Sequence, residues 1–359
     1  MAATNPGVAT VETKAARSPT SDAWRQLRTP LVYLIPAILV MGFLTFYPLV
    51  YQVYMSFTDY GVIKAEGKQT LNRFGPNGQP PPNYRPAQFV GLKNYTDILT
   101  GNPQFIAQLA AVSGGQFNFW RMLAFNLWWT FSNVGFHVAL GILIAVLLNV
   151  EGLWGRRIYR AIFILPMVVP NLVIATVWKN MFDDQYGAIN QLIGLFVGGP
   201  VNIRWFNQIE PPIPGIPLPL SYYAMLIANI WLGWPFMTIV ATGALQSIPK
   251  DMYEAASIDG ATGTQQFWNI TLPLLRPAMV PAAMVGFVMT FNLFHVIYFM
   301  SGGGPLGQTE ILVTQAFKLL NVYQLYGVAA AFSVLIAAVL IPIFLITNRI
   351  SRATESYDV

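Results

Sequence analysis

The sequence contains no cysteine and few charged residues. Of its 359 residues, 10% are Asp, Glu, Lys or Arg and 55% are hydrophobic, whereas a soluble domain carries about 25% charged residues. The absence of cysteine excludes disulfides, thiolate metal sites and a cysteine nucleophile. The shortage of charge indicates that lipid, rather than water, surrounds much of the chain.

Charged residues are missing from six long windows of the sequence. Each window can hold about 20 apolar residues, the number that crosses about 30 Å of hydrocarbon as a helix. Lipid offers no hydrogen-bond partners to the backbone, so segments of this length must be helices. The sequence therefore predicts an all-α integral membrane protein with about six transmembrane helices. They lie near residues 31–57, 124–149, 160–180, 222–247, 278–300 and 327–349.

Several prolines fall inside the predicted spans, and the closest pair is Pro166 and Pro170. Membrane helices tolerate proline when neighbouring groups satisfy the freed carbonyls, so we expect kinks. For the close pair, an ordinary packing kink is favoured over a hinge. Residues 185–203 also lack charge, but their glycine and proline favour an external loop with a short interfacial helix over a further span.

Basic residues in short loops predict the orientation of the chain, because Lys and Arg concentrate on the cytoplasmic side of membrane proteins. They occur at Arg156, Arg157 and Arg160 between the second and third spans, and at Arg349 and Arg352 after the last span. We therefore expect both termini in the cytoplasm. Lys and Arg form no basic run, so the formal net charge of +5 reflects topology and predicts no nucleic-acid partner.

Two short helices around a turn are predicted between the fourth and fifth spans. Pro249 suits the first turn of a helix, and Asp259-Gly260 is a favourable place to end it. Thr262 and Gln265 resemble a capping box that starts a second helix, which we expect Pro273 to stop. Small residues here expose backbone that a partner could approach closely, although a solvated hairpin explains the same pattern.

The same loop resembles a family motif. The matching positions are Glu254, Ala255, Ala256, Asp259, Gly260, Ala261, Phe267, Leu272, Pro273 and Pro277. They resemble the EAA loop of ABC importer permeases, which implies the type I ABC importer permease fold. In that family the loop is the cytoplasmic coupling helix, which sits in a cleft of the ATP-hydrolysing subunit and transmits its closure to the membrane helices. The resemblance assigns coupling to Glu254, Ala255, Ala256, Asp259, Gly260 and Ala261.

Further patches resemble the maltose-type permeases of carbohydrate importers. They are residues 89–95, 187–190, 302–305 with Thr309 and Leu312, 316–317 and 327–330. The likeness covers roughly residues 30–350 and departs from the family's shorter members at 61–86 and 101–122. It implies a sugar substrate and three kinds of partner: a second permease, ATP-binding cassette ATPase subunits and an extracytoplasmic solute-binding protein.

The predicted organisation follows from the spans and from this resemblance. It has a disordered cytoplasmic tail at 1–30, a first anchor helix at 31–57, a long extracytoplasmic segment at 58–123, a permease core at 124–350 with the coupling loop at 250–277, and a cytoplasmic tail at 351–359. The first apolar stretch is too long for a cleavable signal peptide.

No Gly-x-x-x-x-Gly-Lys-Ser/Thr phosphate loop occurs, so another subunit must hydrolyse ATP and this chain is not expected to be an enzyme. A secondary transporter, the main rival, usually places charged groups inside the membrane, and the predicted spans have none in their middle. His137 and His295 lie on different spans without an acidic partner, which favours packing or cavity histidines. No cofactor or metal site is predicted.

A neutral solute, such as a sugar or oligosaccharide, fits the lack of charge in the spans. Aromatic rings offer faces for sugar rings, and Asn side chains offer hydrogen bonds. The candidate path residues are Asn229, Trp231, Trp234, Asn292, Phe294 and Tyr298. Each of them could instead be a packing or interfacial residue, and an ABC permease for a non-sugar solute stays open as an alternative.

Overall fold

The computed structural model describes residues 32–61, 63–65, 68–70, 87–113, 117–150 and 152–355. The predicted tail at 1–30, part of the predicted segment 58–123 and the last residues of the tail 351–359 lie outside the described residues. The chain divides into two compact units, Met1–Tyr54 and Met55–Val359, which are considered separately below.

The described part of the first unit is a single helix. It runs from Val32 to Ser56, contains the π turn η1 (Gly42–Phe46) and continues as α2 (Tyr47–Ser56), whose last residues belong to the second unit. At 1.5 Å per residue, its 25 residues extend about 37 Å, enough to cross a bilayer. This helix corresponds to the predicted span near 31–57.

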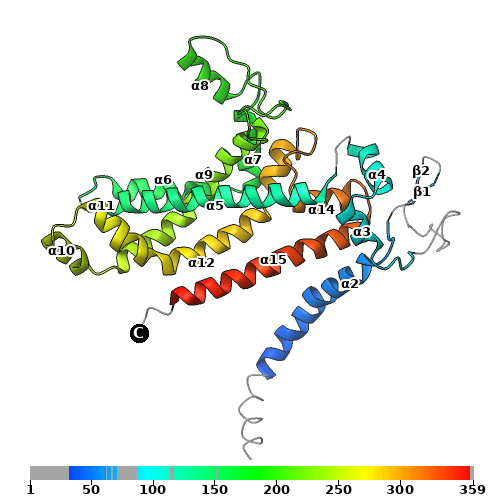
Figure 1. Cartoon of the computed structure of the whole chain (residues 1–359), viewed down its shortest axis with the longest axis horizontal. Helices are drawn as coiled ribbons and strands as arrows, with labels where there is room; N and C mark the ends of the chain where they lie inside the picture. Colours follow the sequence, from blue (N-terminus) through cyan, green and yellow to red (C-terminus); the bar gives the residue numbers. More distant parts are fainter. Residues whose placement is uncertain are drawn as a thin grey trace, which may run out of the picture. The chain divides into compact units, whose positions relative to one another are not determined.

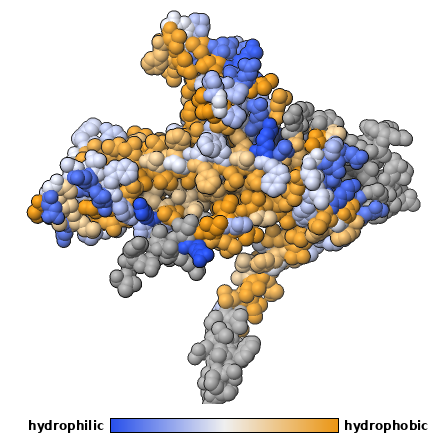
Figure 2. Space-filling model, in the orientation of Figure 1, coloured by the Kyte–Doolittle hydropathy of each residue, from blue (hydrophilic) through white to orange (hydrophobic). Residues whose placement is uncertain are grey.

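Four long helices of the second unit form a bundle: α5 (Phe119–Asn149), α9 (Leu220–Ser247), α12 (Leu272–Phe291) and α15 (Tyr326–Glu355). They lie side by side (Figure 1). Between the bundle ends, hydrophobic residues dominate the face shown in Figure 2. Within the part of the chain that the structure describes, five helices are long and apolar enough to span a membrane, or six if one bent pair is counted as a span.

Small residues bring α5 and α9 together. A Cβ at Gly141 would overlap Met237, and a Cβ at Gly233 would overlap the ring of His137. Close approach at small residues is the usual way in which membrane helices pack. Ser132 is hydrogen-bonded to Tyr222, and further along both helices Gly141 contacts Met237. Because the residue numbers rise together, α5 and α9 run in the same direction.

The bent pair consists of α6 (Arg156–Val168) and α7 (Asn171–Met181), whose axes differ by 98°. The predicted span near 160–180 is therefore broken, and the packing kink favoured for Pro166 and Pro170 was too mild. Pro166 stays inside α6, whereas Pro170 stands at the break and keeps Val169 extended, at ψ 133°. A residue before proline is disfavoured in helical geometry, which ends α6 there.

Shorter elements occupy the two ends of the bundle (Figure 1). One end, here called the α14 end, carries α3 (Lys93–Thr100), α4 (Pro103–Ser113), α13 (Phe294–Val296), η3 (Ile297–Ser301) and α14 (Leu312–Asn321). The antiparallel strands β1 (Ile63–Ala65) and β2 (Lys68–Thr70) pair Ile63 with Thr70. The other end, the α10 end, carries α10 (Lys250–Ile258), α11 (Gly263–Gln266) and η2 (Phe267–Thr271). Helix α8 (Ala188–Val197) has 10 residues, too few for a span, as expected for 185–203.

Candidate functional site

The predicted helical turn is present at the α10 end. Pro249 precedes α10, Asp251 lies in its first turn, and Asp259 ends it. Gly260 follows with a φ of +80°, the left-handed conformation expected for a glycine after a helix. The first helix and its stop signal are thus confirmed.

The second helix begins as predicted but does not stop at Pro273. The capping box at Thr262 is complete, with Gln265 as its partner. The chain then continues through the π turn η2 directly into α12, so the expected stop was wrong. Pro273 stands in the first turn of α12, where the missing N–H of proline is tolerated. The π turn keeps the helix continuous just before it, because Leu272 N–H bonds to Phe267 O.

The loop 250–277 is braced by contacts within itself and by packing against the bundle. The hydroxyls of Tyr253 and Thr271 lie 3.0 Å apart, and Gln266 Nε2 donates to Ser257 Oγ at 2.8 Å. Tyr253 and Phe267 also pack against the buried cluster that includes Leu275. This bracing holds the helical turn in one orientation.

Its outer side is open. Glu254, Ala255, Asp259 and Gly260 are exposed, whereas Ala256 and Ala261 are half-buried. Ile258, which stands among them, is 87% exposed. A rigid helix that combines small residues, two carboxylates and an uncovered isoleucine has the chemistry of a partner-binding surface.

The six predicted path residues fall into two groups. On α9, Asn229 is buried, and its backbone carbonyl oxygen lies 2.8 Å from His137 Nε2. Its side-chain Nδ2 has no partner among the described residues. Trp231 packs edge-on against Trp178 at 6.0 Å, and Trp234 packs against Phe163 at 5.1 Å.

The second group lies where α12 breaks. Asn292 follows the end of α12 and donates to Val288 O at 3.0 Å. Phe294 and Tyr298 stack at 4.8 Å, and both rings contact Phe317 of α14. Of the six candidates, Phe294 and Tyr298 contact each other, whereas the three on α9 face different helices. His137 and His295 belong to different elements, and no metal-binding group occurs among the described residues.

Sequence reasoning missed Asn126, a fully buried residue of α5. Its Nδ2 donates to Phe291 O, the last residue of α12, at 3.1 Å, and its Oδ1 accepts from Leu312 N, the first residue of α14, at 3.0 Å. One side chain therefore joins three elements beside the second candidate group. An amide near the start of an apolar window was the available signal.

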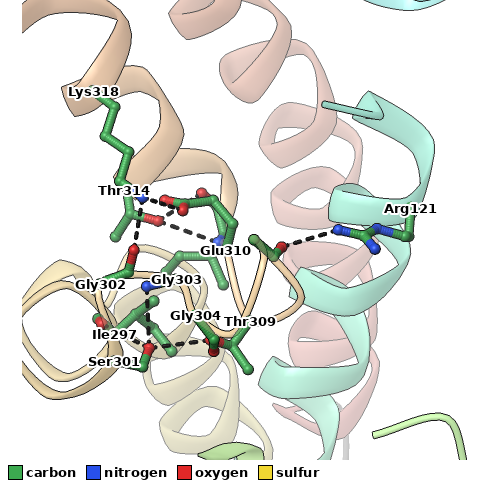
Figure 3. A network of polar contacts seen from close by, with 12 residues as sticks. Arg121, Ile297, Ser301, Gly302, Gly303, Gly304, Thr309, Glu310, Thr314 and Lys318 are labelled. Atoms are coloured by element: carbon green, nitrogen blue, oxygen red, sulfur yellow. Dashed lines mark hydrogen bonds and ion pairs between the residues drawn. The ribbon is translucent and has the colours of Figure 1, made fainter. Parts of the chain in front are cut away.

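A network of polar contacts holds the loop between η3 and α14 (Figure 3). The buried Glu310 carboxylate forms an ion pair with Lys318, which also donates to Gly302 O at 2.7 Å. Gly303 has a φ of +85°, and a Cβ there would overlap Glu310. Arg121 from α5 donates to Gly307 O at 3.0 Å, so the loop is bound to α5 as well as to α14.

Asparagine side chains in residues 89–95 and 187–190 make similar bonds to backbone groups. In the first patch, Asn94 Nδ2 donates to Ser56 O and Thr58 O, both at 2.8 Å. In the second patch, Asn190 Nδ2 donates to Ile203 O at 3.1 Å, and its Oδ1 accepts from Trp205. These residues shape the chain, since each satisfies backbone groups of a distant segment.

A bundle of membrane-crossing helices with a broken span and an exposed helical loop at one end defines a multi-spanning membrane protein. The chain belongs to the family of binding-protein-dependent transport system inner membrane components, whose model matches residues 137–356. It is therefore a multi-pass inner-membrane permease of an ABC importer.

Relatives of known name support this membership. The chain is 31% identical to the galactooligosaccharides transport system permease protein GanP of Bacillus subtilis, over 88% of this chain and 68% of GanP. It is 32% identical to the maltodextrin permease MdxF of the same organism, over 92% of this chain and 70% of MdxF. It is 33% identical to the trehalose/maltose permease MalF of Thermococcus litoralis, over 74% of this chain and 80% of MalF.

The fold agrees with a solved importer. The chain matches a bacterial ABC transporter that imports the acidic polysaccharide alginate with a TM-score of 0.69, at 18% identity, over 94% of this chain and 99% of that one. At this identity the likeness shows the fold alone, which is that of an ABC importer permease.

Proposed function

We propose that this permease carries a neutral sugar or oligosaccharide through a path shared with a second permease, driven by separate ATPase subunits and supplied by an extracytoplasmic binding protein. The observation that carries the proposal is the braced, outward-facing loop with Glu254, Ala255, Ala256, Asp259, Gly260 and Ala261. Its fixed inner side and open outer side suit a helix that passes the motion of a docked ATPase to α12. The chain itself supplies no catalytic group in this scheme.

The names of the relatives support a sugar as the solute, since those relatives transport galactooligosaccharides, maltodextrin, and trehalose or maltose. The two candidate groups contribute Asn229, Trp231, Trp234, Asn292, Phe294 and Tyr298 to the path. The unpaired Nδ2 of Asn229 is a hydrogen-bond donor that a sugar hydroxyl would satisfy. A non-sugar solute is the alternative.

Both termini and the loop 250–277 face the cytoplasm in this scheme. Residues 58–123 are then extracytoplasmic, and 124–350 form the permease core. The support is that α5 and α9 both finish at the α10 end, where Arg156, Arg157 and Arg160 begin α6. Because the chain has no cysteine, a single Thr264→Cys variant can be labelled cleanly. Labelling from outside intact cells by an impermeant reagent would refute this orientation.

Reconstitution tests the whole proposal. The chain purified alone should not hydrolyse ATP, whereas the complex with its partners should hydrolyse ATP and take up an oligosaccharide when the binding protein is present. ATP hydrolysis by this chain alone would refute the division of labour. A cognate binding protein that holds a charged amino acid or an inorganic anion would refute the sugar assignment.

A further inference from the structure

A groove formed by α5, α6 and α9 has a mainly apolar lining with basic and polar residues at one end, which matches the apolar tail and charged headgroup of a phospholipid. Its volume is about 280 Å³. Its apolar lining residues are Leu148, Phe163, Ile164, Trp234, Pro235 and Ile239. Its polar lining residues include Arg160 and Gln246, and none of the described residues that line it is acidic.

Two arginines beside this groove have donors that lack an acceptor. Arg160 Nη2 and Arg156 Nε are both buried without a hydrogen-bond partner among the described residues. The two residues are four apart on α6, and Arg156 also donates from Nη2 to Asn149 Oδ1 at 3.1 Å. Buried guanidinium donors without acceptors are unfavourable, and an anionic oxygen would satisfy them.

Arg156 and Arg160 line two different spaces, which share Gln246 in their lining. Arg156 lines a neighbouring cavity of about 770 Å³, and Gln246 lines both that cavity and the groove. The larger cavity contains one carboxylate, that of Glu254. The polar end of the groove therefore opens toward a second polar space at the α10 end, and its apolar part extends toward the middle of α9.

The position of the groove along the membrane fits a lipid. With 28 residues, α9 is about 42 Å long, which exceeds the roughly 30 Å of hydrocarbon. Gln246, next to the last residue of α9, then stands at the level of the headgroups, whereas Trp234 lies within the hydrocarbon. Ile164 and Ile239 are exposed along the groove, as expected for a surface in contact with acyl chains. Trp154, before α6, is 84% exposed and suits the membrane interface.

We propose that this groove binds an anionic phospholipid, whose phosphate is held by Arg156 and Arg160 and whose acyl chain lies along Phe163, Ile164 and Ile239. A neutral solute would leave the guanidinium donors without charge compensation. An anion without a tail would leave the apolar part of the groove uncovered. Basic pockets between membrane helices are general sites for anionic headgroups. The lipid site adjoins both other sites, because Trp234 of the proposed path lines the groove and Glu254 of the loop 250–277 lines the cavity beside Arg156.

The test compares arginine variants of α6 in the assembled importer complex. Phosphatidylglycerol retained by the purified complex is counted by native mass spectrometry. A photoactivatable phosphatidylglycerol with the reactive group in its acyl chain then maps the bound position. We expect R156Q/R160Q to reduce retention about tenfold and R157Q to change it less than about twofold. Arg157 lies on the same turn, but its side chain is exposed. R157Q removes one charge where the double variant removes two, so R160Q alone is its charge-matched counterpart and should already reduce retention more than R157Q does. We expect cross-links in peptides that contain Phe163 or Ile239.

Several outcomes would overturn the proposal. Equal losses in R157Q and R156Q/R160Q would indicate general surface attraction. Equal retention of phosphatidylcholine would remove the role of the negative charge. Displacement of the lipid by inorganic phosphate at millimolar concentration would indicate a simple anion site. Absence of cross-links on α6 and α9, with the groove covered by the second permease, would assign the arginines to a protein interface. R160K, which keeps the charge, controls for misfolding and should retain the lipid.

Discussion

At the α14 end of the bundle, buried side chains bind backbone groups as far as 186 residues away, as Asn126 does to Leu312. At the α10 end, the loop is braced over short distances, as between Tyr253 and Thr271, which are 18 residues apart. At the α14 end, these contacts join the end of α12, the start of α14 and the loop between η3 and α14. The second end leaves Ile258 and Glu254 uncovered. The contrast teaches that the α14 end is stabilised from within the chain, whereas the α10 end presents a surface that a partner must cover.

Lys318→Met should have the largest effect on stability, because it leaves the buried Glu310 carboxylate without its partner. Breaking a buried ion pair from one side costs about 3 kcal/mol. We expect a clear drop in the thermal unfolding midpoint of the purified complex. The double variant Glu310→Gln/Lys318→Met removes both charges and should recover more than half of the loss. If Lys318→Met were as stable as the parent, the ion pair between Glu310 and Lys318 would not stabilise the α14 end.

Asn126→Leu comes next. The substitution keeps the size of the side chain but leaves Phe291 O and Leu312 N unpaired, at a cost of about 2 kcal/mol. Thr130→Val is the matched control: Thr130 is also fully buried, but its hydroxyl bonds only to Asn126 O within the same helix. Both are measured by thermal unfolding of the complex. Equal effects of the two variants would show that Asn126 does not act across the three elements.

At the α10 end, Tyr253→Phe removes the hydroxyl that contacts Thr271 and leaves the packing of the ring intact. A part-buried hydrogen bond of this kind contributes about 1 kcal/mol. We expect a small fall in the unfolding midpoint together with a lower uptake rate per ATP hydrolysed, because α10 is then held less firmly on η2, which continues into α12. An unchanged ratio of uptake to hydrolysis would mean that this contact plays no part in transmission.

The sequence predicted the spans well because charge-free windows report directly on the hydrocarbon core. The cap at Thr262 and the left-handed Gly260 were also predicted, because both depend on neighbouring residues. The partners of Asn126 were not predictable, since they lie 165 and 186 residues away and have no local pattern. The break at Pro170 and the passage of the helix through Pro273 depend on the bonding of adjacent turns, which composition does not reveal.

The roles of the coupling and path residues follow neither from the positions of the spans nor from the helix caps. The exposure of Glu254 and Asp259 depends on how the loop 250–277 packs on the bundle, which local sequence patterns do not report. The two candidate path groups likewise combine polar and aromatic side chains that pack well by themselves. Their assignment therefore depends on how the complex behaves, and the α10 end offers the sharpest comparison.

Reversal of Glu254 to Lys should have the smallest effect on stability and the most direct effect on transport. The side chain is exposed, so the unfolding free energy should change by less than about 0.5 kcal/mol. Gly260→Trp adds a bulky group at the same surface, and Thr264→Lys adds a positive charge to an exposed position elsewhere on the loop. The measurement is subunit association together with sugar uptake per ATP hydrolysed, at equal membrane levels. We predict that Glu254→Lys and Gly260→Trp lose coupled uptake while Thr264→Lys keeps it; normal association and uptake in the first two variants would contradict the coupling role of this loop.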